Sequence, residues 1–121
     1  HVPHHKAIDT LNAHDIYLLL PGPGKGTITG KLFEYLAFHR PILCVGGKGG
    51  GLESLLIEVG ANRPYDENDM EGIGKMLISW IQHKKKGELI EGRVDQSRLS
   101  MFDRKVQVGR LAAWLSNLCA N

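Results

Sequence analysis

The sequence predicts an α/β fold, with a parallel sheet flanked by helices. Two observations support this prediction. Short apolar runs of strand length, at 15–20 and 41–45, alternate with longer segments whose apolar residues recur at helical spacing. Each run also ends in a glycine-rich loop, at 21–30 and 46–51. Because ligands bind at the carboxyl ends of parallel strands, both loops are candidate parts of a binding site.

The elements of the first half follow from the spacing of their apolar residues. Residues 3–12 carry a short apolar helical face. The run 15–20 is apolar on both faces and stops at Pro21, which predicts a strand buried on both sides. A helix is expected at 31–38. The run 41–45 then predicts a second buried strand.

The middle of the chain predicts a helix at 52–59, which Gly60 ends. Its buried face is expected to consist of Leu52, Leu55, Leu56 and Val59. The segment 61–65 follows with the composition of a short strand. Pro64 restricts that strand to an edge of the sheet, because proline cannot donate a hydrogen bond to a central ladder.

Two longer helices are predicted in the last third of the chain. The first is capped by Asn68 or Asp66, and a polar connection at 87–96 follows it. Its apolar face is made by Met70, Ile73, Met76, Leu77, Trp80 and Ile81. The second spans about 99–118 and is expected to bury Val108, Leu111, Trp114, Leu115 and Leu118.

Composition narrows the class of protein. A chain of 121 residues fits one domain, and its net charge of +2 gives no reason to expect nucleic acid as a partner. The basic run 83–86 falls where a helix should end, and cations there complement the helix dipole. Cys44 and Cys119 form neither a disulfide framework nor a metal pattern, which favours a reducing, cytoplasmic compartment. The start without Met leads us to expect a fragment of a longer chain.

The first glycine loop admits one reading as a nucleotide kinase. Residues 21–27 resemble the phosphate loop of adenylate kinases, with Lys25 reaching the terminal phosphates. The signature G-x-x-x-x-G-K-[ST] fails at its first glycine, however, where Leu19 lies inside the predicted strand. The second strand also lacks the terminal aspartate that would hold Mg²⁺. A phosphotransferase is therefore an alternative and not the main hypothesis.

The loop and its helix taken together resemble another family. Residues 30–37 read GKLFEYLA and residues 40–43 read RPIL. This combination resembles the C-terminal, donor-binding domain of family 4 (group 1) GT-B glycosyltransferases, a Rossmann-like domain. Further matches to that family, in the same order along the chain, are 13–19, 50–60, 102–105 and 111–112.

The resemblance implies a set of donor contacts. Glu34 is expected to bind the ribose hydroxyls of the nucleotide, because a carboxylate offers two acceptor oxygens to the two donors of a vicinal diol. The loop before the helix would meet the diphosphate through backbone amides, two hydroxyls and a cation. These loop contacts are Gly26, Thr27, Thr29, Gly30 and Lys31. No catalytic residue is assigned within the chain.

The resemblance also implies an activity and its partners. The expected reaction is a retaining, hexosyltransferase-type transfer from a UDP or GDP sugar to an acceptor hydroxyl, in polysaccharide or glycan synthesis. No metal or cofactor is expected, since helix dipoles and basic side chains would stabilise the leaving diphosphate. The acceptor site would belong to an N-terminal domain of the full-length chain, so this fragment alone should be inactive. Peripheral contact with the inner face of a membrane is compatible with such an enzyme.

One departure from the family pattern concerns the transferred sugar. Many members carry two glutamates in the pattern E-x7-E, and the first of them contacts the sugar. Glu34 fits the second, whereas the first would fall on Gly26. The sugar contact from this half, and the identity of the sugar, are therefore open. A Rossmann-like binding module without catalytic function remains a third hypothesis.

Overall fold

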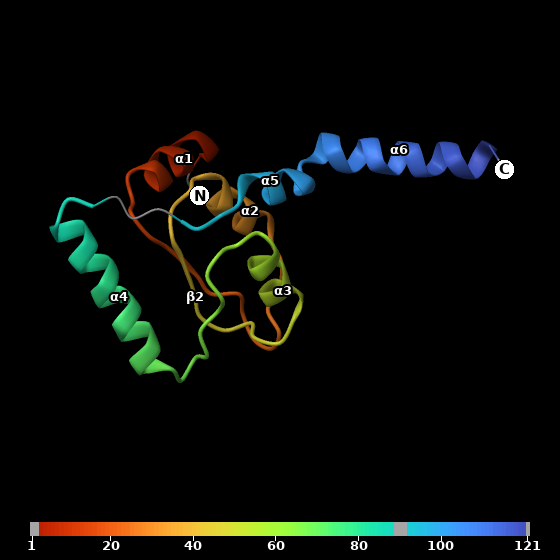
Figure 1. Ribbon diagram of the computed structural model, residues 1–121. Helices are drawn as coiled ribbons and strands as arrows, with labels where there is room; N and C mark the ends of the chain where they lie inside the picture. The colour runs from red at the N-terminus through yellow and green to blue at the C-terminus, as the bar shows by residue number, and fades with distance from the viewer. Residues whose placement is uncertain (1–2, 89–91, 121) are drawn as a thin grey trace.

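The computed structural model describes residues 3–88 and 92–120, which form a mixed α/β structure around two parallel strands (Figure 1). This confirms the predicted fold class at the level of helices around a parallel strand pair. In chain order the elements are α1 (His4–Asn12), β1 (Tyr17–Leu19), α2 (Gly30–Ala37), β2 (Ile42–Cys44), α3 (Gly51–Glu58), α4 (Met70–Lys85), α5 (Gln96–Leu99), the 3-10 helix η1 (Ser100–Phe102) and α6 (Arg104–Ala120).

The sheet is a parallel pair in which Tyr17 is opposite Ile42 and Leu19 is opposite Cys44. The edge strand predicted at 61–65 is reduced to one isolated parallel bridge, between Val45 and Tyr65. Two hydrogen bonds of 2.8 Å hold this bridge, from the N–H of Tyr65 to Cys44 and from the N–H of Gly46 to Tyr65. The proline before Tyr65 has no N–H to extend the pairing.

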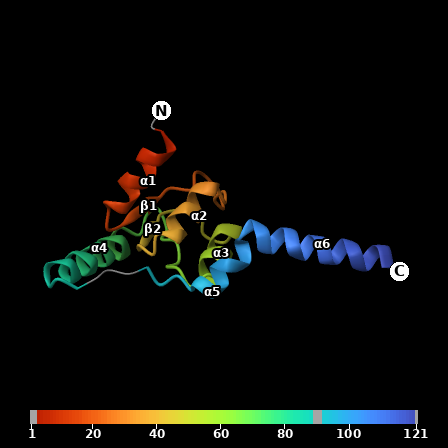
Figure 2. The ribbon, with the colours of Figure 1, turned by 90° about the horizontal axis from the view of Figure 1, so that it is seen from above.

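The main core lies between the strands and the helices α2 and α3. Tyr17 connects this core to α1, with its ring centroid 4.7 Å from that of Tyr35 and its hydroxyl donating to the carbonyl of Leu11 in α1. The helix α4 lies on the other side of the strands (Figure 2). The buried cluster consists of Tyr17, Leu19, Leu32, Tyr35, Leu36, Ile42, Cys44, Leu52, Leu55, Leu56 and Val59. The apolar face predicted for α3 is therefore confirmed.

The strand β1 is buried on one face only, so the prediction of a strand buried on both sides is wrong. Leu18 is 54% exposed and Leu20 is 67% exposed. Leu43, opposite Leu18 in the neighbouring strand, is only 6% exposed. An apolar residue in a strand shows a preference for burial, but burial also needs an element on that face. In the described part of the chain, β1 lacks such cover at Leu18.

The helix α4 begins one residue later than the predicted caps allow. Asp69 caps it by accepting a 2.9 Å hydrogen bond from the N–H of Gly72, so the assignment of the cap to Asn68 or Asp66 is wrong. The predicted apolar face is only partly buried, because Met70 is 74% exposed and Ile81 is 51% exposed. The basic residues do fall in the last turn, as predicted.

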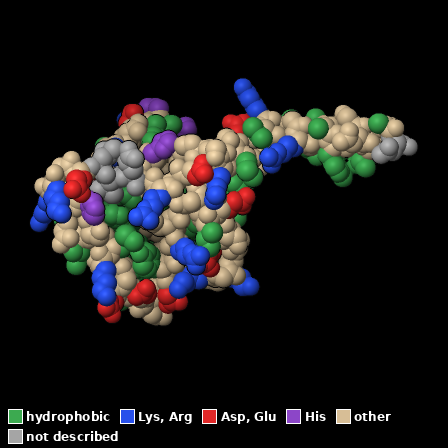
Figure 3. Space-filling view, viewed as in Figure 1, with side chains coloured by type: hydrophobic (Ala, Val, Ile, Leu, Met, Phe, Trp, Pro, Cys, Tyr) green, Lys and Arg blue, Asp and Glu red, His purple; other side chains and the backbone are tan. Residues whose placement is uncertain are grey.

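The closing helix differs most from its prediction. The helical path is interrupted at Asp103, whose backbone is extended. The side chain of Asp103 then starts α6 by accepting a 2.7 Å hydrogen bond from the N–H of Lys105. From there α6 projects away from the domain as a lone arm, with hydrophobic side chains exposed along it (Figures 1 and 3). The residues predicted to be buried are all exposed, namely Val108, Leu111, Trp114, Leu115 and Leu118. Among the described residues, no helix is long and apolar enough to cross a membrane.

The exposure of α6 leads to a stability prediction. We expect Leu111→Ala to change the free energy of unfolding of this chain by less than about 0.5 kcal/mol, as is usual for exposed positions. The reason is that Leu111 is 54% exposed and α6 projects from the domain. Urea denaturation followed by circular dichroism measures the change. A loss above about 2 kcal/mol, typical of buried leucine, would show that α6 packs on the domain in solution.

Candidate functional site

The two glycine loops lie at the carboxyl ends of β1 and β2 and pack against each other. A Cβ atom added to Gly26 would lie 3.0 Å from the Cα of Gly47, and one added to Gly50 would lie 2.6 Å from the carbonyl oxygen of Lys25. The sequence made the loop 46–51 a candidate part of a binding site, and a loop with this many glycines can equally serve only to turn the chain. The contacts show that Gly26, Gly47 and Gly50 are needed for close backbone packing.

Glu34 lies in the second turn of α2, on the face that is exposed. The opposite face of the helix buries Leu32, Tyr35 and Leu36, and Glu34 is turned away from this face. Although Glu34 stands between two aromatic residues on a helix that packs against the sheet, its side chain is therefore solvated. Its carboxylate makes no hydrogen bond or ion pair within residues 3–88 and 92–120, so both oxygens are available to a ligand.

The predicted phosphate contacts lie on two sides of the start of α2. Gly30 lines the larger pocket described below, and the two threonines and the lysine lie on the side of β1. Thr27, Thr29 and Lys31 line a pocket of about 310 Å³ together with the end of β1. The Nζ of Lys31 lies 5.7 Å from the ring centroid of Tyr35, in cation–π geometry. Thr29 occupies the N-cap position of α2 without a side-chain hydrogen bond, so its hydroxyl does not satisfy the first amides of the helix.

Not all of the predicted backbone donors are free. The N–H of Thr27 donates to the carbonyl of Pro21 at 3.4 Å. Gly26 is packed against Gly47 and Leu52, and it lines neither of the pockets beside α2. Of the amides predicted at 26–30, that of Thr27 is therefore engaged within the loop, whereas Gly30, at the helix start, lines a pocket.

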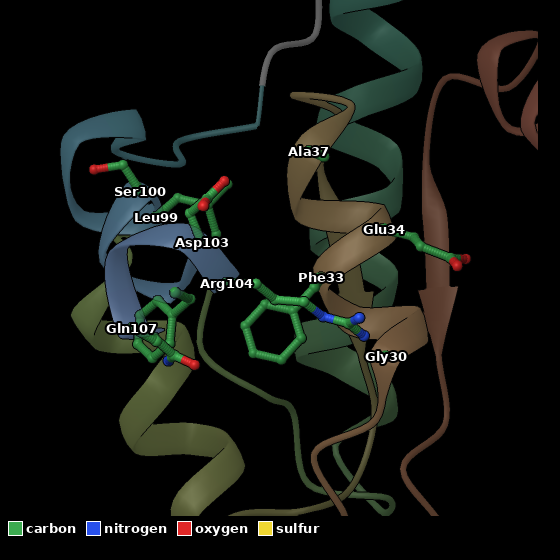
Figure 4. Close-up of a pocket in the computed structure, with 10 residues that line it drawn as sticks. Gly30, Phe33, Glu34, Ala37, Leu99, Ser100, Asp103, Arg104 and Gln107 are labelled. Atoms are coloured by element: carbon green, nitrogen blue, oxygen red, sulfur yellow. The ribbon is translucent and has the colours of Figure 1, made fainter. Parts of the chain in front are cut away.

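A larger pocket of about 730 Å³ opens on the other side of α2, against the closing segment (Figure 4). Its apolar wall is a contact between the rings of Phe33 and Phe102, whose centroids are 5.7 Å apart. Its charged groups are Glu34, Asp103 and Arg104. Sequence reasoning did not single out Arg104, although it lies in the matched motif at 102–105. The lining residues are Gly30, Phe33, Glu34, Ala37, Leu99, Ser100, Phe102, Asp103, Arg104 and Gln107.

The loop 21–27 does not form the geometry of a phosphate loop. In such loops the lysine belongs to the junction with the following helix, whereas α2 begins at Gly30 and Lys25 lies five residues earlier in the loop. The side chain of Lys25 is exposed, and its backbone lies beneath Gly50. This arrangement does not favour the phosphotransferase alternative.

The described residues offer neither a reactive cysteine at Cys44 nor a cluster of metal-binding side chains. Burial raises the pKa of the Cys44 thiol to about 11, so this group is protonated at neutral pH and is a poor nucleophile. Within residues 3–88 and 92–120, no group of three or more His, Cys, Asp or Glu side chains is placed to hold a metal ion. The unpaired charged groups around α2 are thus the features with the clearest capacity to bind a ligand.

Comparison with known proteins gives no assignment, because no protein-family model, curated protein or solved structure matches the chain.

Proposed function

We propose that this chain is the donor-binding domain of a retaining GT-B glycosyltransferase, the Rossmann-like C-terminal half of that fold. It would hold a UDP or GDP sugar while a hexosyl group passes to an acceptor hydroxyl in polysaccharide or glycan synthesis. The observation that carries the proposal is Glu34, an exposed and unpaired carboxylate near the start of a helix. That helix begins at the ligand-binding edge of two parallel strands.

The position of Glu34 suits a ribose contact. A vicinal diol presents two hydroxyl donors, and an ionised carboxylate accepts both of them through its two oxygens. Because no group of the described chain pairs with Glu34, a ligand does not have to displace an internal partner. The same residue stands in the motif K-x-x-E-Y-L-A, which resembles the ribose-binding helix of family 4 enzymes.

The start of α2 suits the diphosphate. The first amides of a helix have no intrahelical acceptor and carry the positive end of the helix dipole, so they favour an anion. At this helix the side chain of the N-cap residue Thr29 does not satisfy them, and its carbonyl accepts only from the N–H of Leu32, at 3.1 Å. The exposed hydroxyls of Thr27 and Thr29 add two further donors at the same place.

The proposal includes a division of labour with a second domain. The acceptor site and the remaining catalytic groups would lie on an N-terminal domain, with the sugar transferred in the cleft between the two. This chain alone would then bind nucleotide weakly and transfer nothing. Any contact with a membrane would belong to the full-length enzyme at its cytoplasmic face.

Nucleotide binding tests the proposal. We expect UDP or GDP in the presence of EDTA to shift amide signals of α2 and its preceding loop in ¹⁵N-labelled protein. Glu34→Gln should weaken this binding about 10- to 100-fold, because a hydrogen bond to a charged group contributes about 1.5–3 kcal/mol. Glu58→Gln, the same change at another exposed helical site, should leave it unaltered.

Either of two outcomes would contradict the proposal, and a third would contradict the ribose contact of Glu34. One is the absence of any shift with either nucleotide at millimolar concentration. The other is binding of ATP that requires Mg²⁺ and is lost in Lys25→Ala, which would support the phosphotransferase instead. Equal weakening by Glu34→Gln and Glu58→Gln would point to a general effect of charge and not to a ribose contact.

A further inference from the structure

We infer that Arg104 binds the diphosphate of the nucleotide from the side of α2 opposite to Lys31. The inference rests on the proposed function, and it adds a residue from the far end of the chain to the donor site. Arg104 is the first residue of α6 and lines the pocket of about 730 Å³ together with Gly30.

The guanidinium of Arg104 has no internal partner among the described residues. The neighbouring carboxylate of Asp103 accepts a 2.7 Å hydrogen bond from the N–H of Lys105, which starts α6. The ion pairs found in the described chain join other residues, and none includes Arg104. A fixed positive charge is thus left open to a ligand in a pocket that also holds apolar surface.

The direction of the side chain places this charge at the helix start. Figure 4 shows Arg104 reaching across the pocket toward Gly30, with the Phe33 ring beside it. The carboxylate of Glu34 points away, to the other side of the helix. The two groups thus flank the first turn of α2, so a nucleotide would contact both by passing Gly30, with its ribose at Glu34 and its phosphates in the pocket at Arg104.

Arg104 is better suited to the diphosphate contact than Lys31, the cation expected from the sequence. Lys31 lies over the Tyr35 ring and lines the smaller pocket on the β1 side. Guanidinium groups bind phosphate oxygens through two parallel hydrogen bonds, whereas an ammonium acts as a point charge. The pocket volume falls within the range of about 300–1,000 Å³ that is usual for small-molecule sites, and the rings of Phe33 and Phe102 give it an apolar wall.

The test compares ligands that differ in their phosphates. Binding of UDP, UMP and uridine, and of GDP, GMP and guanosine, is measured by NMR titration of the 121-residue chain. Arg104→Ala is expected to weaken binding of the diphosphate about tenfold and to leave the nucleoside nearly unaffected. Arg104→Lys should retain part of the affinity. Arg110→Ala removes the same charge from the same exposed helix and should have no effect.

The outcomes separate this inference from the function on which it rests. If Arg104→Ala binds the diphosphate like the wild type while Glu34→Gln weakens it, the inference is overturned and the proposed function stands. If wild-type protein binds none of the six ligands, both fail. Equal weakening of nucleoside and diphosphate binding would show that Arg104 supports the structure of the pocket and does not contact phosphate, which also overturns the inference.

Discussion

The Leu56→Ala variant is expected to lose about 2–5 kcal/mol of its free energy of unfolding, the range for a buried leucine whose cavity does not collapse. Leu56 has no exposed surface and belongs to the cluster between the strands and the helices α2 and α3. Since small domains are stable by only about 5–15 kcal/mol, this single change removes a large part of the margin. Urea denaturation of the two proteins measures the loss.

A matched control makes the result specific to the core. Leu18→Ala removes the same atoms from a residue that is 54% exposed, and it should cost less than about 1 kcal/mol. Similar losses of stability in the two variants would contradict the finding that β1 is buried on one face and exposed on the other at Leu18. A large loss at Leu18 alone would show that β1 is covered on that face in solution.

Gly26→Ala is expected to destabilise the chain by about 2–5 kcal/mol. Its φ of 75° is a left-handed conformation that costs other residues about 1–2 kcal/mol, and overpacking adds about 1–3 kcal/mol. The added Cβ would lie 2.9 Å from Leu52 and 3.0 Å from the Cα of Gly47. Gly22→Ala is the control, because Gly22 has a φ of 81° but no atom within 4 Å of the added Cβ.

The difference between these two variants isolates the packing of the glycine loops. If Gly22→Ala costs as much as Gly26→Ala, the close approach of the loops contributes nothing and only the backbone conformation matters.

A further variant, Gly26→Glu, would restore the E-x7-E spacing of the family that the chain resembles. We expect it to lose stability and to gain no affinity for a nucleotide sugar, since position 26 has no room for a side chain.

The departure from the family pattern at Gly26 thus has a structural counterpart. A side chain there would collide with Gly47 of the second loop, which is itself buried. From the sequence, Gly26 was an expected diphosphate contact and the position at which one expected glutamate was missing. The structure adds that the two loops approach too closely for any larger residue. If the proposed function holds, contact with the transferred sugar must come from other groups.

Local sequence patterns were sufficient to predict helices whose limits are set by neighbouring residues. The helix predicted at 31–38 is found at Gly30–Ala37, and the helix predicted at 52–59 is found at Gly51–Glu58. Gly60 follows the second helix with a φ of 76°, as a glycine stop should. The spacing of apolar residues and the glycine that follows are properties of neighbouring residues, so the sequence displays them directly.

Burial could not be predicted in the same way. The apolar spacing in α6 correctly predicted a helix, and Trp114 lies on its apolar face. The side chain of Trp114 is nonetheless 58% exposed, because spacing shows which face of a helix is suited to burial and not whether another element covers it. The same reason explains the exposed Leu18. The cap at Asp69 was missed because Asp66, Asn68 and Asp69 are all good capping residues. In the structure Asp66 accepts from the N–H of Asn68 instead, and Asp69 accepts from Gly72 in the helix.

For the candidate site, the sequence by itself identified Glu34, through a motif carried within a single helix. Only the tertiary structure decided that Glu34 is exposed and unpaired, since this depends on which face of α2 the sheet and α3 cover. Only the tertiary structure also brought Arg104 beside Gly30, because the two are far apart in the chain and meet where α6 begins. A motif records residues that are close in sequence, whereas a binding pocket requires residues that the fold brings close in space.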